Sequence, residues 1–321
     1  MEQPLAIYRA SPTRDAGRSG ATMRRRAAGD GPDRLVRVGP NAFVRGADWD
    51  AAGPRQRYVT RVFARLGRRS AAAAGSHVSA AAAHGLPWLY PWPDTVHVTV
   101  PKSQYRSGSE SLKLHTRPFG ADDVVEHAGV RFTSVARTVA DVALLGDVRA
   151  AVVVADAALR RGIARQQIVR AVGGTAHERG RATAALVLEL ADGRSGSPAE
   201  SFTRVVFREL GLPAPVLQQP FVVDGHRYEV DFWFPEHGVI VEVDGRAKYT
   251  QDRYRNGRSA AEVIVDEKRR HERLLTVPGV RWIIRLEWRD LWDLDQLARR
   301  LRAAGLPCAV RPVRSARGLA A

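Results

Sequence analysis

The sequence RYEVDFWFPEHGVIVEVDGRAKY, residues 227–249, decides the fold of the C-terminal part of the chain. Residues 227–234 are dense in aromatic and β-branched side chains, residues 235–238 are typical of a turn, and residues 239–243 are apolar. The stretch therefore predicts two buried strands joined by a tight turn.

Three carboxylates interrupt this apolar pattern: Asp231, Glu242 and Asp244. Acidic residues are depleted in strands, and burial of an unpaired carboxylate is costly. Side chains alternate between the faces of a strand, so Asp231 shares a face with Trp233, and Glu242 shares one with Asp244. If the register is favourable, the acids converge. Such a cluster requires a metal ion or a cationic partner.

The flanking sequence predicts an ordered series of elements. Ser197, Pro198 and Glu200 match a capping box, which begins a helix over 198–210. Glu200 thus has a structural explanation, and the alternative that it faces the other carboxylates stays open. The elements expected beyond this helix are strands 216–222, 227–234 and 239–243, a helix at about 261–275, a strand over 280–285 and a helix at about 294–304.

This α-β-β-β-α-β order, with an acid on the second strand and Glu-x-acid on the third, resembles the PD-(D/E)xK nuclease superfamily. The segment VDFWFPEHGVIVEVDG is similar to the Vsr-like endonuclease branch of this superfamily. The resemblance implies a restriction-endonuclease-like domain over 197–310, Mg²⁺ held by Asp231 and Glu242, Glu200 as the acid of the first helix, and phosphodiester hydrolysis. Mg²⁺ prefers hard oxygen ligands and lowers the pKa of bound water, in agreement with this assignment.

Asp244 stands where many such nucleases carry lysine, and an acid cannot supply positive charge to an attacking water. Lys248 or Lys268 could take over that role. Alternatively Asp244 is a third acid of the metal site, or the site is degenerate and structural. In the last case arginines would neutralise the acids, and the candidates are Arg269, Arg281 and Arg285. Arg285 is also a candidate for a phosphate contact.

The N-terminal part contains a second pattern. The segment RLVRVGPNAFVR, residues 34–45, alternates on both sides of Gly39-Pro40-Asn41 and predicts a β-hairpin. Arg34, Arg37 and Arg45 lie on this hairpin, which could be the wing of a winged helix that contacts DNA phosphates.

The segments RLVRVGPNAFVRG, SHVSAAAAHGLP, VHVTVP, TSVARTVAD and DAALRRG resemble the AbiEi-type antitoxin and transcriptional-regulator family of actinobacteria. The resemblance implies a winged-helix-like DNA-binding region over 31–90 and a small mixed α/β domain over 91–191. It also makes a toxin partner or a homodimer a reasonable expectation. Residues 1–30 lack an apolar period and are expected to be a disordered basic arm.

Four histidines fall in the N-terminal half. His77 and His84 lie seven residues apart, about two helical turns, while His97 and His115 fall in predicted strands. With no third ligand nearby in the sequence, packing or capping is the expected role of His77 and His84, and His97 and His115 are expected to be hydrogen-bonded structural histidines.

Composition agrees with a nucleic-acid partner. The 321 residues carry a net charge of +16 with a pI near 11.0, which favours a polyanionic partner. A G+C-rich coding bias, which raises the arginine content, would give the same excess. The lone Cys308 argues against disulfides and cysteine-based zinc sites. No apolar run reaches the roughly 18 residues of a membrane span, and no secretory signal is evident, so a cytoplasmic protein is expected.

Together these observations predict an α+β protein that binds DNA and carries a Mg²⁺-dependent endonuclease-like domain. The alternative is a non-catalytic DNA-binding antitoxin or transcriptional regulator whose nuclease fold is degenerate.

Overall fold

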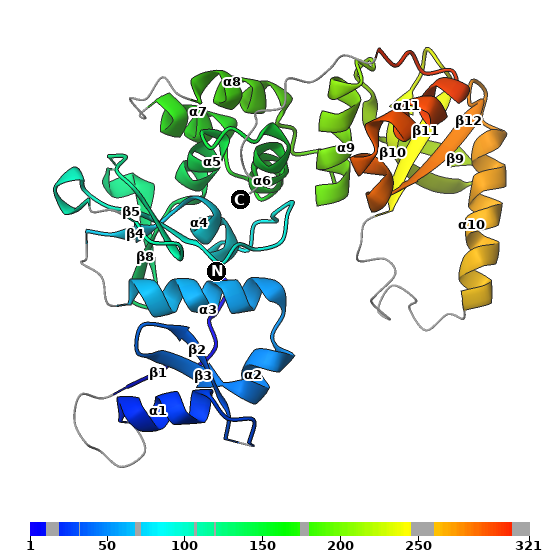
Figure 1. Ribbon diagram of the computed structural model, residues 1–321. Coiled ribbons are helices and arrows are strands. Elements are labelled where there is room, and N and C mark those ends of the chain that lie inside the picture. The colour runs from blue at the N-terminus through cyan, green and yellow to red at the C-terminus, as the bar shows by residue number, and fades with distance from the viewer. Residues whose placement is uncertain are drawn as a thin grey trace. The chain divides into compact units, whose positions relative to one another are not determined.

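The fold was obtained as a computed structural model and is of the α+β class (Figure 1). The structure describes residues 1–10, 19–31, 33–67, 72–105, 108–118, 120–173, 180–244 and 260–309, with side chains for all of these except 121 and 260–264. Its contacts divide the chain into two compact units. Unit 1 comprises Met1–Val154 and Gly162–Leu186, and unit 2 comprises Ala155–Arg161 and Val187–Ala321. Within the described residues, no helix is both long enough and apolar enough to traverse a lipid bilayer.

Unit 1 begins with a three-stranded antiparallel sheet in the order β1-β3-β2. The predicted hairpin is confirmed as β2 and β3, and it turns through Asn41, which takes a left-handed φ of 52° that asparagine tolerates. The elements of this part are β1 (Tyr8–Arg9), α1 (Gly20–Ala27), β2 (Leu35–Gly39), β3 (Ala42–Arg45), α2 (Gly46–Ala51) and α3 (Pro54–Leu66).

The expected disordered arm over residues 1–30 is wrong for the residues described there. Strand β1 pairs with β3 through Tyr8 and Phe43, and the hydroxyl of Ser19 accepts a hydrogen bond from the Thr22 amide at 3.2 Å to cap α1. Only Met23 of this helix is buried, against Phe43. One buried side chain in eight residues leaves no apolar period to detect, which explains the missed helix.

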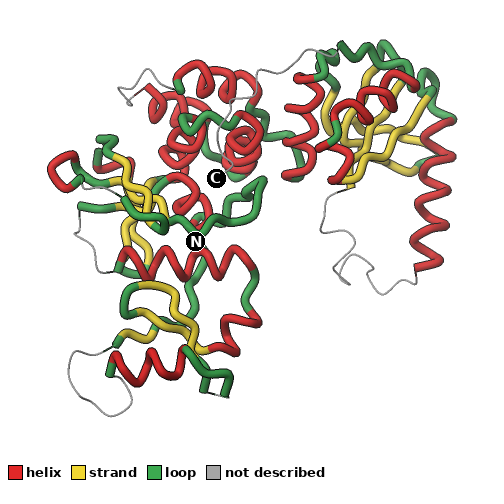
Figure 2. Tube along the Cα trace, in the orientation of Figure 1, coloured by secondary structure: helices red, strands yellow, loops and turns green. Residues whose placement is uncertain are grey.

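The rest of unit 1 is a five-stranded mixed sheet with helices against it, visible as yellow strands and red helices in Figure 2. The strand order is β6-β5-β4-β8-β7; β4–β8 and β5–β6 are parallel pairs and the others antiparallel. The strands are β4 (Ala74–Gly75), β5 (Val96–Thr99), β6 (Leu112–His115), β7 (Val124–His127) and β8 (Val130–Thr133). The helices are α4 (His77–Ala83), η1 (Lys102–Gln104), η2 (Ala121–Asp123), α5 (Val135–Ala143), α6 (Val148–Arg160), α7 (Arg165–Gly173) and α8 (Arg181–Leu190).

Unit 2 is built on a four-stranded sheet in the order β12-β11-β10-β9, with β11–β12 parallel and the other pairs antiparallel. The ring of Phe207 on α9 packs against Phe232 and Phe234 of β10. Leu274 on α10 packs in a cluster with Ile240, so the two helices cover opposite faces of the sheet (Figure 1). The elements are α9 (Pro198–Glu209), β9 (Val216–Val223), β10 (His226–Phe234), β11 (Val239–Asp244), α10 (Ala260–Leu275), β12 (Trp282–Glu287), η4 (Trp288–Trp292) and α11 (Leu294–Ala303).

Helix α6 contributes to both units, because its last residues, from Ala155 onward, belong to unit 2. There the fully buried Asp156 forms an ion pair with Arg204 of α9 at 2.7 Å. Asp156 also accepts a hydrogen bond from the amide of Asp192 at 2.7 Å. The end of α6 is therefore tied to unit 2 through a buried charge.

Candidate functional site

Glu200 lies in the first turn of α9 with a buried side chain. Its amide donates to the Ser197 hydroxyl at 3.2 Å, as the capping motif predicts, while its carboxylate accepts from the amide of Gly196 at 2.7 Å. The same carboxylate oxygen accepts from Nε2 of Gln218 at 2.6 Å. Ser197 therefore caps the helix, while the Glu200 carboxylate bonds both to the segment before the helix and to Gln218 of the sheet, so the two interpretations of Glu200 are compatible.

Asp231 is held at the middle of β10 by both of its oxygens. Oδ2 accepts from the amide of Val243 on β11 at 2.8 Å, and Oδ1 lies 3.5 Å from Nε2 of Gln218. One amide nitrogen thus reaches carboxylates from the first helix and from the second strand. Gln218 has a left-handed φ of 51°, which a non-glycine residue adopts only where the surroundings enforce it.

Gln218 is a site residue that the sequence reasoning missed. The available signal was a pair of glutamines, Gln218 and Gln219, inside a strand that otherwise reads as apolar. A polar amide there is best explained by the acids that it bridges.

Glu242 lies on β11 with 9% of its surface exposed, and two arginines neutralise it. Oε1 lies 2.6 Å from the guanidinium of Arg270 on α10, and Oε2 lies 3.6 Å from that of Arg285 on β12. Arg285 stands directly beside Glu242 in the parallel register and also binds Glu267 at 2.9 Å. The expected carboxylate partnership of Arg285 is thus confirmed, whereas Arg270 was not among the expected partners.

The charge of Asp244 also acts on the guanidinium of Arg285. Burial alone would lower the pKa of Arg285, but its hydrogen bond with Glu267 and the charges of Glu242, Glu267 and Asp244 raise that pKa above its ordinary value. The guanidinium of Arg285 therefore stays charged within an acidic cluster on the α10 face.

The predicted acids do not all meet at one point. Among the described residues, Glu200, Asp231 and Glu242 do not form a group with ligand atoms within 4.8 Å of one another. Lys248 lies outside the described residues. Lys268 lies on α10 with a side chain that is 78% exposed, and its ammonium is 3.9 Å from Glu272 one turn along the same helix.

The three arginines of the N-terminal hairpin have partners within unit 1. Arg34 binds Asp50 at 2.5 Å and Arg45 binds Asp48 at 2.8 Å, while Nε of Arg37 lies 3.4 Å from the carbonyl of Gly39. Acids of α2 thus offset part of the positive charge expected on the wing. Arg37 remains exposed on β2.

No protein-family model matches the chain, and no solved structure matches it. Two curated proteins of Mycobacterium tuberculosis do, one from strain CDC 1551 / Oshkosh and one from strain ATCC 25618 / H37Rv, and both are described as uncharacterized. Each is 35% identical over 131 residues, which cover 36% of this chain and 48% of the relative. The chain therefore spans about half the length of the curated relatives it matches.

Proposed function

We propose that this protein binds DNA and that unit 2 is an endonuclease-like domain of PD-(D/E)xK type. The observation that carries the proposal is the amide of Gln218, which joins Glu200 of the first helix to Asp231 of the second strand. The order of elements α9-β9-β10-β11-α10-β12 supports it, as does the position of Glu242 on the third strand. The net charge of +16 supports a polyanionic substrate.

The residues present fit Mg²⁺ in part. Glu200 and Asp231 offer hard oxygen ligands near each other, and Mg²⁺ is usually held by one or two carboxylates together with water and substrate phosphate. When bound, the ion would supply an activated water and neutralise charge on the scissile phosphate. Glu242 could join it only after release from Arg270, which lies 2.6 Å away. Gln218 would keep the two other carboxylates oriented.

A second candidate function is DNA binding without hydrolysis. It is favoured by the two arginines on Glu242 and by Asp244 in the position where a lysine would assist catalysis. Removing two charges from water is costly, and a pair in good geometry resists displacement by a cation. In this case the acids and arginines would hold the sheet together and orient α10.

The experiment that separates the two functions compares nicking of supercoiled plasmid in Mg²⁺ by the unaltered protein, Asp231→Ala and Glu229→Ala. Glu229 is the matched control, because it lies on the same strand with a half-exposed carboxylate. The proposal predicts nicking by the first and third proteins and a loss of at least a hundredfold in Asp231→Ala. Equal nicking by all three would contradict the assignment of Asp231.

If none of the proteins nicks DNA, binding decides between the remaining possibilities. DNA affinity is then measured between 50 and 200 mM salt, a range over which each phosphate contact contributes a slope of about −0.9. A steep slope without nicking would support the non-catalytic function. A DNA affinity that does not change with salt concentration would argue against DNA binding and would contradict both candidate functions.

A further inference from the structure

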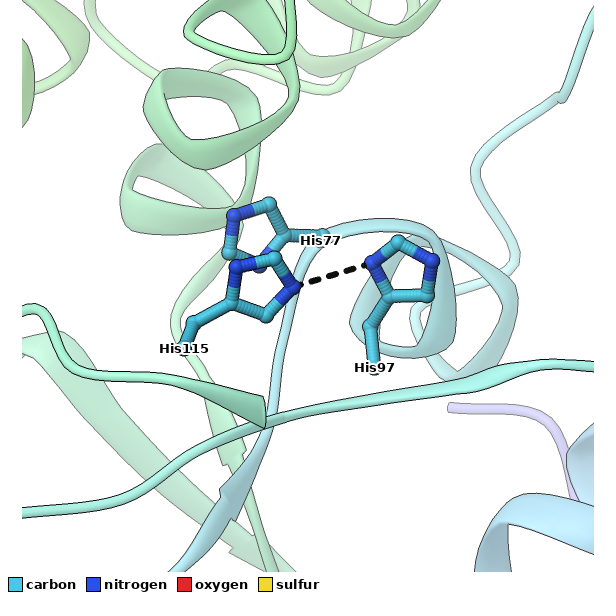
Figure 3. Close-up of side chains that lie close together, drawn as sticks. All are labelled: His77, His97 and His115. Atoms are coloured by element: carbon cyan, nitrogen blue, oxygen red, sulfur yellow. Dashed lines mark hydrogen bonds between the residues drawn. The ribbon is translucent and has the colours of Figure 1, made fainter. Parts of the chain in front are cut away.

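Three histidines from separate elements of unit 1 meet inside it, as Figure 3 shows. His77 is the first residue of α4, His97 lies on β5 and His115 ends β6. Each offers a ring nitrogen, and these nitrogens lie within 4.8 Å of one another. His77 and His97 are buried and His115 is half-buried.

The fold brings these residues together through sheet pairing. Strands β5 and β6 run parallel with Thr99 opposite His115, so His97 and His115 lie on one face. The chain leaves β4 beside β5, where the amide of Ser76 donates to the carbonyl of His97 at 3.1 Å. His77 follows at once with a left-handed φ of 51°, a strained conformation for a histidine at the start of a helix.

The ring nitrogens of His115 and His97 lie at a spacing suited to two ligands of one ion. Nε2 of His115 lies 3.1 Å from Nδ1 of His97. Two nitrogens bound tetrahedrally to one zinc ion at about 2.0–2.1 Å would lie about 3.3 Å apart. The rings of His77 and His115 stack with centroids 3.6 Å apart.

The state of His77 points most directly to a missing partner. Its Nδ1 lies 2.9 Å from the Ser76 hydroxyl, and its Nε2 is buried with no hydrogen-bond partner among the described residues. A buried polar atom left unpaired costs about 1–3 kcal/mol, so it needs an explanation. In the tautomer whose Nδ1–H donates to the Ser76 hydroxyl, Nε2 carries a free lone pair, and outer partners orient metal-bound histidines in the same way.

We propose that His77, His97 and His115 bind one transition-metal ion, with Zn²⁺ as the best match. Imidazole suits zinc, copper, iron and nickel, whereas Mg²⁺ requires oxygen ligands, so this site is distinct from the carboxylates of unit 2. Three protein ligands leave a fourth position open to water or another ligand. Thr99, on the same face of β5, has a buried hydroxyl with no partner among the described residues and is suited to hydrogen-bond a ligand there.

The surroundings decide what the open position would accept. The three imidazoles are buried or half-buried, and each must be neutral to coordinate a metal ion. The positive charges of Arg117 and Arg137 act on His77, so the site lies in a positive field. A bound cation there is more stable with an anionic fourth ligand such as hydroxide.

Metal binding also has a geometric consequence. An ion lies close to the plane of each imidazole that binds it, so two stacked rings cannot both point at it. The ring of His77 would turn out of its stack with His115 when the ion binds. The Ser76 hydroxyl can follow this rotation, because a hydroxyl hydrogen rotates to suit its partner.

The test uses tag-free full-length protein, stripped with a chelator and then titrated with Zn²⁺ or Co²⁺. We expect one ion per chain in the unaltered protein and in His226→Gln, a matched control with an exposed histidine in unit 2. His115→Gln should bind at least thirtyfold more weakly. Asp231→Ala should retain the ion, which separates this site from the proposed nuclease site. No binding by the unaltered protein, or equal binding by His115→Gln, would overturn the proposal.

Circular dichroism of the metal-free proteins would reveal misfolding of the variant. A second measurement does not depend on the variant at all. X-ray absorption of the Zn²⁺-loaded unaltered protein counts its ligands directly. We expect three imidazoles and one or two oxygen ligands. A spectrum with fewer than three imidazoles would overturn the site whatever the variant does.

Discussion

Mild acid should destabilise unit 1, because three of its histidines, His77, His97 and His115, stay neutral in the folded state. Burial, reinforced by neighbouring positive charge, lowers the pKa of His97 from 6.5 to about 4, that of His115 to about 3 and that of His77 well below 6.5. The unfolded chain takes up protons at the ordinary pKa of 6.5. The stabilisation is therefore fully present above pH 6.5 and is lost as the pH falls toward 4.

The size of the effect follows from the shifts. At pH 5.5, one unit below the unfolded pKa, each histidine lowers the free energy of unfolding by about 1.4 kcal/mol, or about 4 kcal/mol for three. Asp141 opposes them, because burial raises its pKa to about 6 and its protonation favours the folded state by about 0.8 kcal/mol at pH 5.5. The net loss is about 3 kcal/mol. With a slope of about 2 kcal/mol per molar urea, the midpoint should fall by about 1.5 M.

The assay is urea unfolding at pH 7.5 and 5.5 in the presence of a chelator, with brief deuterium labelling at one fixed pH. Peptides that span residues 77–99 report on unit 1 alone. The variant His115→Gln should lose nearly half of the net pH dependence, about 1.4 of about 3 kcal/mol. Midpoints that agree within about 0.3 M at the two pH values would refute the reasoning.

Two further predictions concern a buried ion pair and a tightly packed glycine. Asp156→Ala should lower the free energy of unfolding of unit 2 by about 3–5 kcal/mol, since it leaves the largely buried Arg204 without its counter-ion; urea unfolding followed through unit 2 peptides measures this. Gly75→Ala should cost about 1–3 kcal/mol in unit 1, because the added Cβ would lie 2.7 Å from the ring of Phe132. Gly31→Ala is its control, with no described atom within 4 Å, and equal melting temperatures of the two variants would contradict the clash.

Local sequence signals predicted most of the secondary structure. The capping box gave α9 at Pro198–Glu209, and alternation gave the hairpin of β2 and β3. Aromatic, β-branched and apolar runs gave β10 and β11. The strand expected over 280–285 lies two residues later, at Trp282–Glu287. Such signals succeed because capping and alternation depend on neighbouring residues alone.

The site was less predictable, because its contacts are set by pairing between distant strands. The parallel register of β11 and β12 places Arg285 beside Glu242, and nothing local specifies that register. Helix α10 then supplies Arg270 where the sequence suggested its neighbour Arg269. Adjacent residues on a helix point about 100° apart, so a small error in helix phase exchanges one for the other.

The histidine cluster shows the same limit more sharply. His77, His97 and His115 are spaced 20 and 18 residues apart and fall in three different elements. The sequence reasoning looked for ligands at helical spacing and compared His77 with His84 instead. His84 has a different role, because its Nε2 lies 2.6 Å from the carbonyl oxygen of Thr133.

The division of helix α6 between the two units determines which fragments of the protein can be expressed separately. A fragment that starts in the glycine-bearing segment at 191–197 would omit residues 155–161 and with them Asp156, the counter-ion of Arg204. Such a fragment should express poorly even though it keeps every strand of the sheet. Adding residues 148–161 in trans as a peptide should restore its solubility, as in a split-protein reporter.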